Sequence, residues 1–233
     1  MKAADGTRIN EWFVPAFGPD RFRVFVGMLF LPYTGMCISF AVIGSLMASE
    51  IHWDRAGAIA LIYALALGIG AHAADSIGSK KAKPWGAFFT KKQIAALMAS
   101  SLAIAYAIGT YYIVAYAPLL AIVAILEGFF LLAYNLELFG GRFHNDFWFA
   151  LSWGALPVMA GYLIQNGGPS ILIIAAAAGA MVASYAEIRL SRPYKQLKKM
   201  GASAKVLETR LKILSLSTIA FCVCLLAARA IML

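Results

Sequence analysis

Residues 68–86 read GIGAHAADSIGSKKAKPWG and close a long hydrophobic run with polar groups. The run ends in His72 and Asp75, and a loop with three lysines, Lys80, Lys81 and Lys83, follows at once. Ionisable residues at the mouth of a membrane helix are costly to place and usually mark a pathway or a site. An acid beside lysines suits a site that holds a metal ion and an anion such as diphosphate. The stretch therefore predicts a membrane-spanning helix with a functional site at its end.

The composition of the whole chain supports a polytopic membrane protein. The 233 residues are 62% hydrophobic and 13% charged, and the mean hydropathy is +0.77. A soluble domain of this size would be about one quarter charged. We expect one all-α transmembrane domain over residues 1–233, with about seven membrane helices. The apolar segments lie at 24–49, 56–74, 93–115, 118–139, 148–164, 170–188 and 213–232.

The basic residues predict the orientation of this bundle. Of the 20 Lys and Arg residues, only Arg55 and Arg229 fall on one side of the expected membrane, and the other 18 fall on the opposite side. The positive-inside rule then makes the N-terminus cytoplasmic and the C-terminus external in a cell membrane. The net charge of +9 lies along one membrane face, which indicates orientation and contact with anionic lipid headgroups rather than nucleic acid. Capture of an anionic substrate is a second explanation, compatible with the first. The connection 191–212 alternates basic and apolar residues, which predicts an interfacial amphipathic segment broken near Gly201.

Three polar clusters stand at the cytoplasmic ends of the expected helices: 72–75, 134–146 and 187–195. Brought together, their acids would offer oxygen ligands to Mg²⁺, and the neighbouring bases would neutralise phosphate oxygens. These acids are Asp75, Glu137, Asp146 and Glu187. Alternatively, each acid pairs locally with a base and anchors a helix end. A transition-metal site that also uses His72 and His144 is a further alternative.

Glu127 lies near the middle of the fourth apolar segment, outside these clusters. A carboxyl group at that depth should face the interior of the bundle and be protonated or paired. It would serve as a proton relay, line a substrate cavity, or make a structural hydrogen bond to a neighbouring helix.

The three clusters resemble sequence motifs of the UbiA superfamily of intramembrane prenyltransferases. In that family the second span ends in an Asn/Asp-rich motif followed by a basic stretch, and residues 72–84 have a similar layout. The turn that begins at Tyr134 and leads into a Gly-rich fifth span also resembles the family, as does Glu187 at the end of the sixth span. The resemblance implies a UbiA-like helical bundle.

The resemblance also implies an activity: Mg²⁺-dependent transfer of a prenyl group from a diphosphate donor to a lipophilic acceptor. The catalytic residues would be Asp75, His72 and Glu187. Because each acidic motif retains a single acid here, the metal ligands would be Asp75, Glu187, Glu137, His144 and Asp146. The substrate-binding residues would be Lys80, Lys81, Lys83, Asn135, Arg192 and Lys195. The alternative is a non-catalytic UbiA-like subunit or lipid-binding scaffold of a membrane complex, and a transporter would need paired repeats that the sequence does not display.

Overall fold

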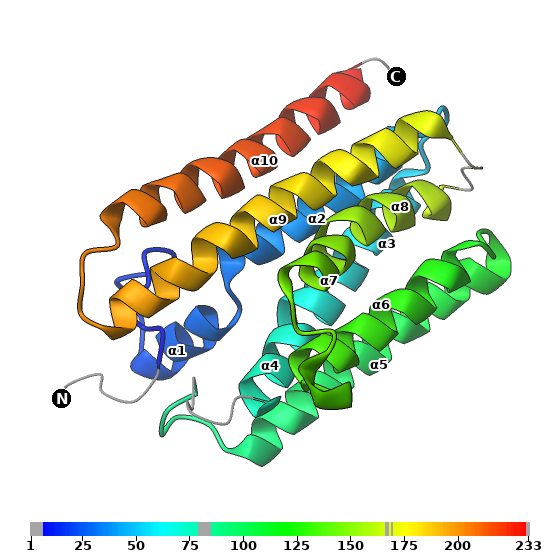
Figure 1. Cartoon of the computed structure of the whole chain (residues 1–233). Coiled ribbons are helices and arrows are strands. Elements are labelled where there is room, and N and C mark those ends of the chain that lie inside the picture. The colour runs from blue at the N-terminus through cyan, green and yellow to red at the C-terminus, as the bar shows by residue number, and fades with distance from the viewer. Residues whose placement is uncertain (1–6, 79–84, 166–167, 169, 232–233) are drawn as a thin grey trace.

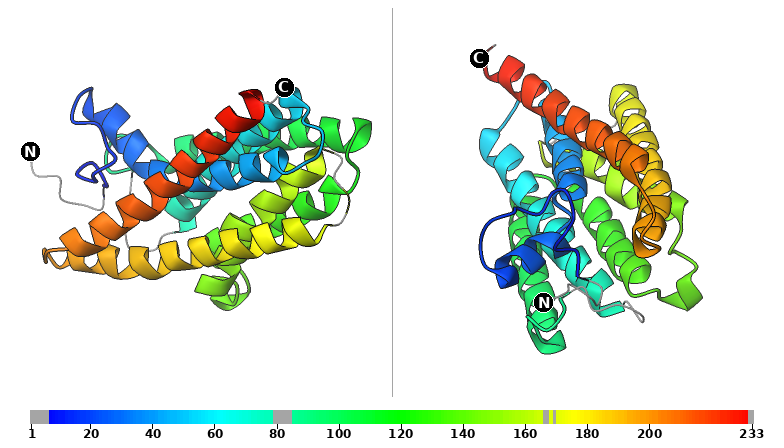
Figure 2. Two further views of the ribbon diagram at one scale, coloured as in Figure 1. Left: turned by 90° about the horizontal axis from the view of Figure 1, so that it is seen from above. Right: turned by 90° about the vertical axis from the view of Figure 1, so that its left-hand side faces the viewer.

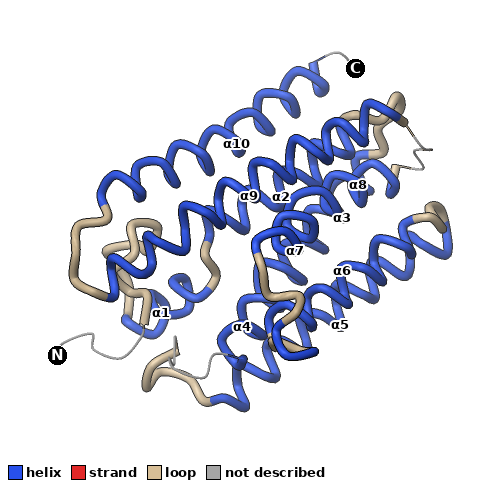
Figure 3. Tube along the Cα trace, in the orientation of Figure 1, coloured by secondary structure: helices blue, strands red, loops and turns tan. Residues whose placement is uncertain are grey.

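The computed structural model describes residues 7–78, 85–165, 168 and 170–231, and all regular secondary structure in these residues is helical (Figures 1 and 3). The predicted all-α class is therefore confirmed. The helices form one elongated bundle in which α1 lies at one end and the last turn of α10 at the other (Figure 1). The α-helices are α1 (Asp20–Met28), α2 (Leu31–Leu46), α3 (Trp53–Tyr63), α4 (His72–Gly78), α5 (Lys91–Ala115), α6 (Leu120–Asn135), α7 (Asp146–Ala150), α8 (Leu156–Ile164), α9 (Ile171–Lys199) and α10 (Lys205–Ile231).

Two of the long helices contain wider π-helical turns. The π-helix η1 (Ala64–Ala71) joins α3 to α4, and η3 (Leu151–Ala155) joins α7 to α8, while η2 (Phe139–Gly141) is a short 3₁₀ turn after α6. Turns of the π type are rare, and those that occur are frequently found at functional sites. Here η1 ends directly before His72, and η3 contains Trp153, which contacts the ring of His72.

Every predicted apolar segment lies mainly on these helices. Five helical stretches among the described residues are long and apolar enough to cross a membrane: Trp53–Gly78, Lys91–Ala115, Asp146–Ile164, Ile171–Lys199 and Lys205–Ile231. The pair α1 and α2, bent by 47°, makes a sixth if it is one span, and α6 is a shorter apolar helix of 16 residues. These lengths fit an integral membrane protein. The count of seven spans and the UbiA-like arrangement stay predictions.

Close helix crossings hold the bundle together. A Cβ atom on Gly44 of α2 would overlap the carbonyl oxygen of Val158, and one on Gly161 of α8 would overlap that of Ala41. The hydroxyl of Ser45 also donates a hydrogen bond to the Gly161 carbonyl at 2.8 Å. Small residues allow helix backbones to approach in a membrane, where van der Waals contact rather than hydrophobic burial drives association. On the other side of α2, α10 packs across α2 and α9 (Figure 2).

The bend between α1 and α2 centres on Phe30. Its φ of 44° places an aromatic residue in the left-handed region, which favours glycine, and Pro32 lies in the first turn of α2. The surrounding structure must therefore hold Phe30 in place, because strained residues of this kind persist only when their contacts determine them.

The connection 191–212 is built differently from the expected separate segment. Helix α9 continues without interruption to Lys199, a turn follows in which Gly201 has a φ of 69°, and α10 begins at Lys205. The break falls near Gly201 as predicted, but helix ends flank it on both sides. Its location in the headgroup layer stays a prediction.

Candidate functional site

A polar cavity of about 170 Å³ lies at the end of the bundle where α2, α4, α6 and α9 meet. We call it the end cavity. It brings together residues from all three polar clusters that the sequence predicted as a site. Those lining it are His72, Asp75, Asn135, His144, Glu187, Arg192 and Lys195. The clusters 72–75 and 134–146 lie where the helical stretches that contain α4 and α6 end, and the cluster 187–195 lies within α9, at the end of its apolar part.

Other predicted site residues lie elsewhere. Asp146 is held by two arginines of α9, at 3.0 Å from Arg192 and 3.6 Å from Arg189, so it anchors α7 to α9. Glu137 is exposed in the turn after α6 and does not line the end cavity. Lys80, Lys81 and Lys83 lie outside the described residues.

Asp75 has a partner that sequence reasoning missed. Its Oδ2 atom lies 3.7 Å from Nη2 of Arg8, in the segment that precedes α1. Burial lowers the pKa of the Arg8 guanidinium, and the negative charge of Asp75 opposes this shift. The Arg8 guanidinium also sits 3.7 Å from the centre of the Phe30 ring, and Nζ of Lys195 lies 4.5 Å from the same ring. No local pattern signals Arg8, because it is far from Asp75 along the chain.

The hydrogen bonds of His72 determine which of its nitrogens carries the proton. The hydroxyl of Thr34 donates to the carbonyl oxygen of Leu29 at 2.8 Å, so its single proton is used. Thr34 must then accept from Nε2 of His72, which is 3.2 Å away. The ring of His72 lies between Phe30 and Trp153, each with a centroid separation of 5.3 Å. A neutral His72 therefore carries its lone pair on Nδ1.

His144 and Asn135 are oriented by main-chain carbonyls in a similar way. Nδ1 of His144 donates to the carbonyl oxygen of Tyr134 at 2.9 Å, and its ring stacks on Tyr134 with centroids 4.4 Å apart. The Asn135 amide nitrogen donates to the carbonyl of Leu131 at 2.8 Å. These bonds leave Nε2 of a neutral His144 and Oδ1 of Asn135 as acceptors in the cavity lining.

Aromatic side chains form much of the remaining wall. Phe149 and Trp153 stack with centroids 5.4 Å apart and planes 11° apart, and Tyr33 of α2 also lines the cavity. Aromatic faces attract cations, including a positively charged reaction intermediate. Sequence reasoning did not single out these rings, because an aromatic residue in an apolar helix is most often a packing residue.

The donor set of the end cavity fits Mg²⁺ bound to a diphosphate. Mg²⁺ keeps several waters and is usually held by one or two carboxylates together with substrate phosphates. Asp75 and Glu187 supply the carboxylates, and Asn135 supplies an amide oxygen. Within the described part of the chain, no group of three or more His, Cys, Asp or Glu side chains is placed to hold an ion by itself. A site of this kind would need the substrate to complete the coordination.

Comparison of the chain with protein-family models, with curated proteins and with solved structures found no match. The function must therefore be argued from the end cavity itself, which has two acids, two cations and an aromatic wall at one end of an apolar helical bundle.

Proposed function

We propose that this protein is a UbiA-like membrane transferase that moves a prenyl group from a diphosphate donor to a lipophilic acceptor. The observation that carries the proposal is that Asp75 and Glu187, from separate helices and separate sequence motifs, line one cavity with Arg192 and Lys195. The resemblance of both motifs to the UbiA superfamily supports the same reading. In this proposal the cavity faces the cytoplasm, because it lies at the end with most of the basic residues.

The residues that line the end cavity, together with Arg8 beside Asp75, have distinct roles in this reaction. Arg8, Arg192 and Lys195 attract the diphosphate and stabilise the charge that accumulates on it as the bond to the prenyl carbon breaks. The aromatic wall with Phe149 and Trp153 stabilises the allylic cation that is left. Mg²⁺, held by Asp75 and Glu187, would supply further neutralisation of the leaving group. His72 is oriented to accept a proton at Nδ1 when the acceptor is alkylated.

The proposal is tested with purified protein in lipid nanodiscs, supplied with radiolabelled prenyl diphosphates of different chain lengths and a membrane lipid extract as the source of acceptor. We expect release of diphosphate that requires Mg²⁺, and a loss of at least about a hundredfold in kcat/KM for Asp75→Asn and for Glu187→Gln. Asp54→Asn is the matched control, because Asp54 lies at the opposite end of the bundle beside Tyr112. Activity that is insensitive to Asp75→Asn would remove the assignment.

One observation favours a second candidate, a non-catalytic scaffold that binds a lipid diphosphate. Asp75 already has a cationic partner in Arg8, so this carboxylate has a counter-charge within the protein. A scaffold would bind prenyl diphosphates with Mg²⁺ and return them unchanged. Equilibrium binding and turnover, measured on the same preparation, separate the two functions.

A further inference from the structure

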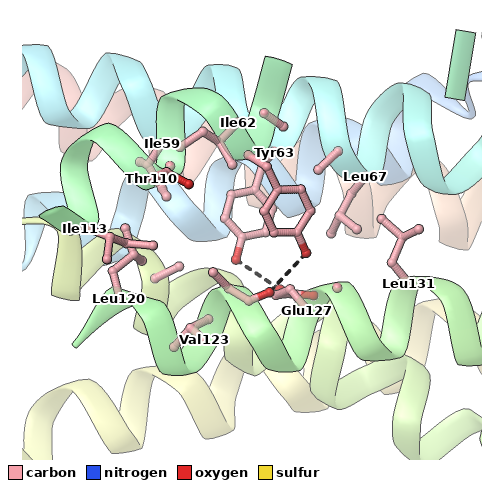
Figure 4. Close-up of a pocket in the computed structure, with 17 residues that line it drawn as sticks. Ile59, Ile62, Tyr63, Leu67, Thr110, Ile113, Leu120, Val123, Glu127 and Leu131 are labelled. Carbon is pink, nitrogen blue, oxygen red and sulfur yellow. Dashed lines mark hydrogen bonds between the residues drawn. The ribbon is translucent and has the colours of Figure 1, made fainter. Parts of the chain in front are cut away.

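A second cavity lies halfway along the bundle, between α3 and η1 on one side and α5 and α6 on the other (Figure 4). It has a volume of about 70 Å³ and is lined mainly by aliphatic side chains, with Tyr63, Tyr106 and Thr110 also in its wall. Glu127 is the sole acid among the described residues that line it. We call it the Glu127 groove. It shares no lining residue with the end cavity. Glu127 lies eight residues before Asn135 on α6, which separates the two sites by about 12 Å along the helix axis.

Only half of the Glu127 carboxyl group has a partner. Its Oε1 atom accepts a hydrogen bond from the hydroxyl of Tyr63 at 3.0 Å, whereas its Oε2 atom is buried with no hydrogen-bond partner among the described residues. The nearby hydroxyl of Tyr106 donates to the carbonyl oxygen of Ala124 at 3.2 Å. An unpaired polar atom in an apolar environment is costly, because it loses its bonds to water and gains none in return.

The groove reaches the outer, apolar surface of the bundle. Two of its lining residues on α5 are exposed, Tyr106 at 44% and Thr110 one turn further along. Small residues keep the space open, since Gly109 has a single neighbour, Ile62 at 3.9 Å, within reach of an added Cβ atom. A molecule dissolved in the bilayer can therefore enter sideways, but a plain acyl chain offers nothing to Oε2.

We infer that the Glu127 groove binds a long-chain, membrane-resident molecule that carries a neutral hydroxyl group, and that this hydroxyl bonds to Oε2 of Glu127. A hydroxyl both donates and accepts, so it satisfies Oε2 whether the carboxyl is ionised or protonated. A phosphate or carboxylate headgroup would repel the ionised form, and its own desolvation at this depth would be large. The aliphatic lining accepts the chain. This site is separate from the diphosphate chemistry of the end cavity.

The inference is tested by photolabelling in nanodiscs with a diazirine-bearing hexadecanol and with the matching diazirine hexadecane, which lacks the hydroxyl. Peptide mass spectrometry measures labelling of α5 and α6. We expect the alcohol to label these helices about tenfold more than the alkane, because it gains one buried hydrogen bond. Glu127→Leu should abolish this preference, and Glu127→Gln, which keeps a donor and an acceptor, should retain most of it.

Gly109→Leu supplies an independent variant, because it fills the groove and leaves Glu127 in place. It should lower the labelling by both probes, whereas Gly179→Leu should not, since Gly179 lies on α9 with no atom within 4 Å of an added Cβ. Equal labelling by the alcohol and the alkane in the wild-type protein, or labelling unchanged by Gly109→Leu, would overturn the inference. Asp75→Asn should leave the labelling unchanged, which separates this result from the fate of the transferase proposal.

Discussion

Asp75 and Glu127 are both acids on apolar helices, but the bundle gives them opposite surroundings. Asp75 is 39% exposed at a helix end and faces the Arg8 guanidinium in a cavity lined by several charged side chains. Glu127 lies midway along α6 with one tyrosine hydroxyl as its partner and aliphatic side chains around it. A cation and other polar groups therefore surround Asp75, whereas largely apolar side chains surround Glu127.

The residue type alone therefore does not specify the chemistry of an acid on an apolar helix. What matters is which partners the neighbouring helices supply. The end cavity is lined by side chains of α2, α4, α6, α7, η3 and α9 and of the residues just before α2 and α7. The Glu127 groove is lined by side chains of α3, η1, α5 and α6 and by one alanine of α8. Both sites depend on the packing of the same helices, and each also depends on its own partner residues. Substitutions can separate these two contributions.

The largest effect should come from disturbing the helix packing on which both sites depend. In Gly161→Leu the new side chain would overlap the Ala41 carbonyl and force α8 away from α2. We expect a loss of about 3 kcal/mol in unfolding free energy, because overpacked helix contacts cannot relax without moving backbone. Denaturant unfolding in detergent measures this value, with Gly179→Leu as the control. A loss equal to that of the control would show that the crossing tolerates separation.

The next largest effect should be specific to the end cavity. Arg8→Met removes the cation beside Asp75 and on Phe30, and should weaken the binding of Mg²⁺–pyrophosphate about tenfold, since one charge-assisted contact is lost. Titration calorimetry gives the affinity. Arg21→Met is the matched control, because Arg21 also lies over a ring, that of Phe89, but outside the cavity. Tighter binding in Arg8→Met would mean that Arg8 competes with the ligand for Asp75.

A smaller effect should be specific to the Glu127 groove. Tyr63→Phe removes the hydrogen bond to Oε1 and should cost about 1 kcal/mol of unfolding free energy. The double variant Tyr63→Phe with Glu127→Leu should recover most of this loss, because replacing both partners by apolar groups leaves no buried atom unsatisfied. Thermal unfolding in nanodiscs measures both, with Tyr185→Phe as an exposed control. If the double variant is the least stable protein, the carboxyl has a partner beyond Tyr63.

The smallest effect should be on the tautomer of His72. Thr34→Val removes the acceptor for Nε2–H and should cost below about 1 kcal/mol, while allowing the proton to move to Nδ1. Nitrogen NMR of selectively labelled histidine reports the change, and the chain has only three histidines to assign. The His144 signal should stay constant, since its partner is the Tyr134 carbonyl. An unchanged His72 signal would mean that another group holds the proton on Nε2.

Sequence patterns predicted the helical class and the position of most of the end cavity. Asp75 and Glu187 each terminate a hydrophobic run, and such ends meet at the same face of a helical bundle, so their convergence could be expected from helix length. The bend at Phe30 was not predictable in this way, because it depends on contacts that hold a left-handed aromatic residue. The ion pairs of Asp146 were not predictable either, because its two arginine partners lie on a different helix.

The apolar helices, and the position of most charged residues near their ends, follow from the amino-acid sequence alone. Hydrophobic length and charge placement are local properties of the chain. Three features are visible only in the tertiary structure: the ion pair of Arg8 with Asp75, the hydrogen bond of Thr34 with His72, and the separate apolar groove that Glu127 lines. Each of these depends on how closely two helices approach and which faces they turn toward each other. That information is distributed over the whole bundle, since every crossing depends on the shapes of the side chains on both helices.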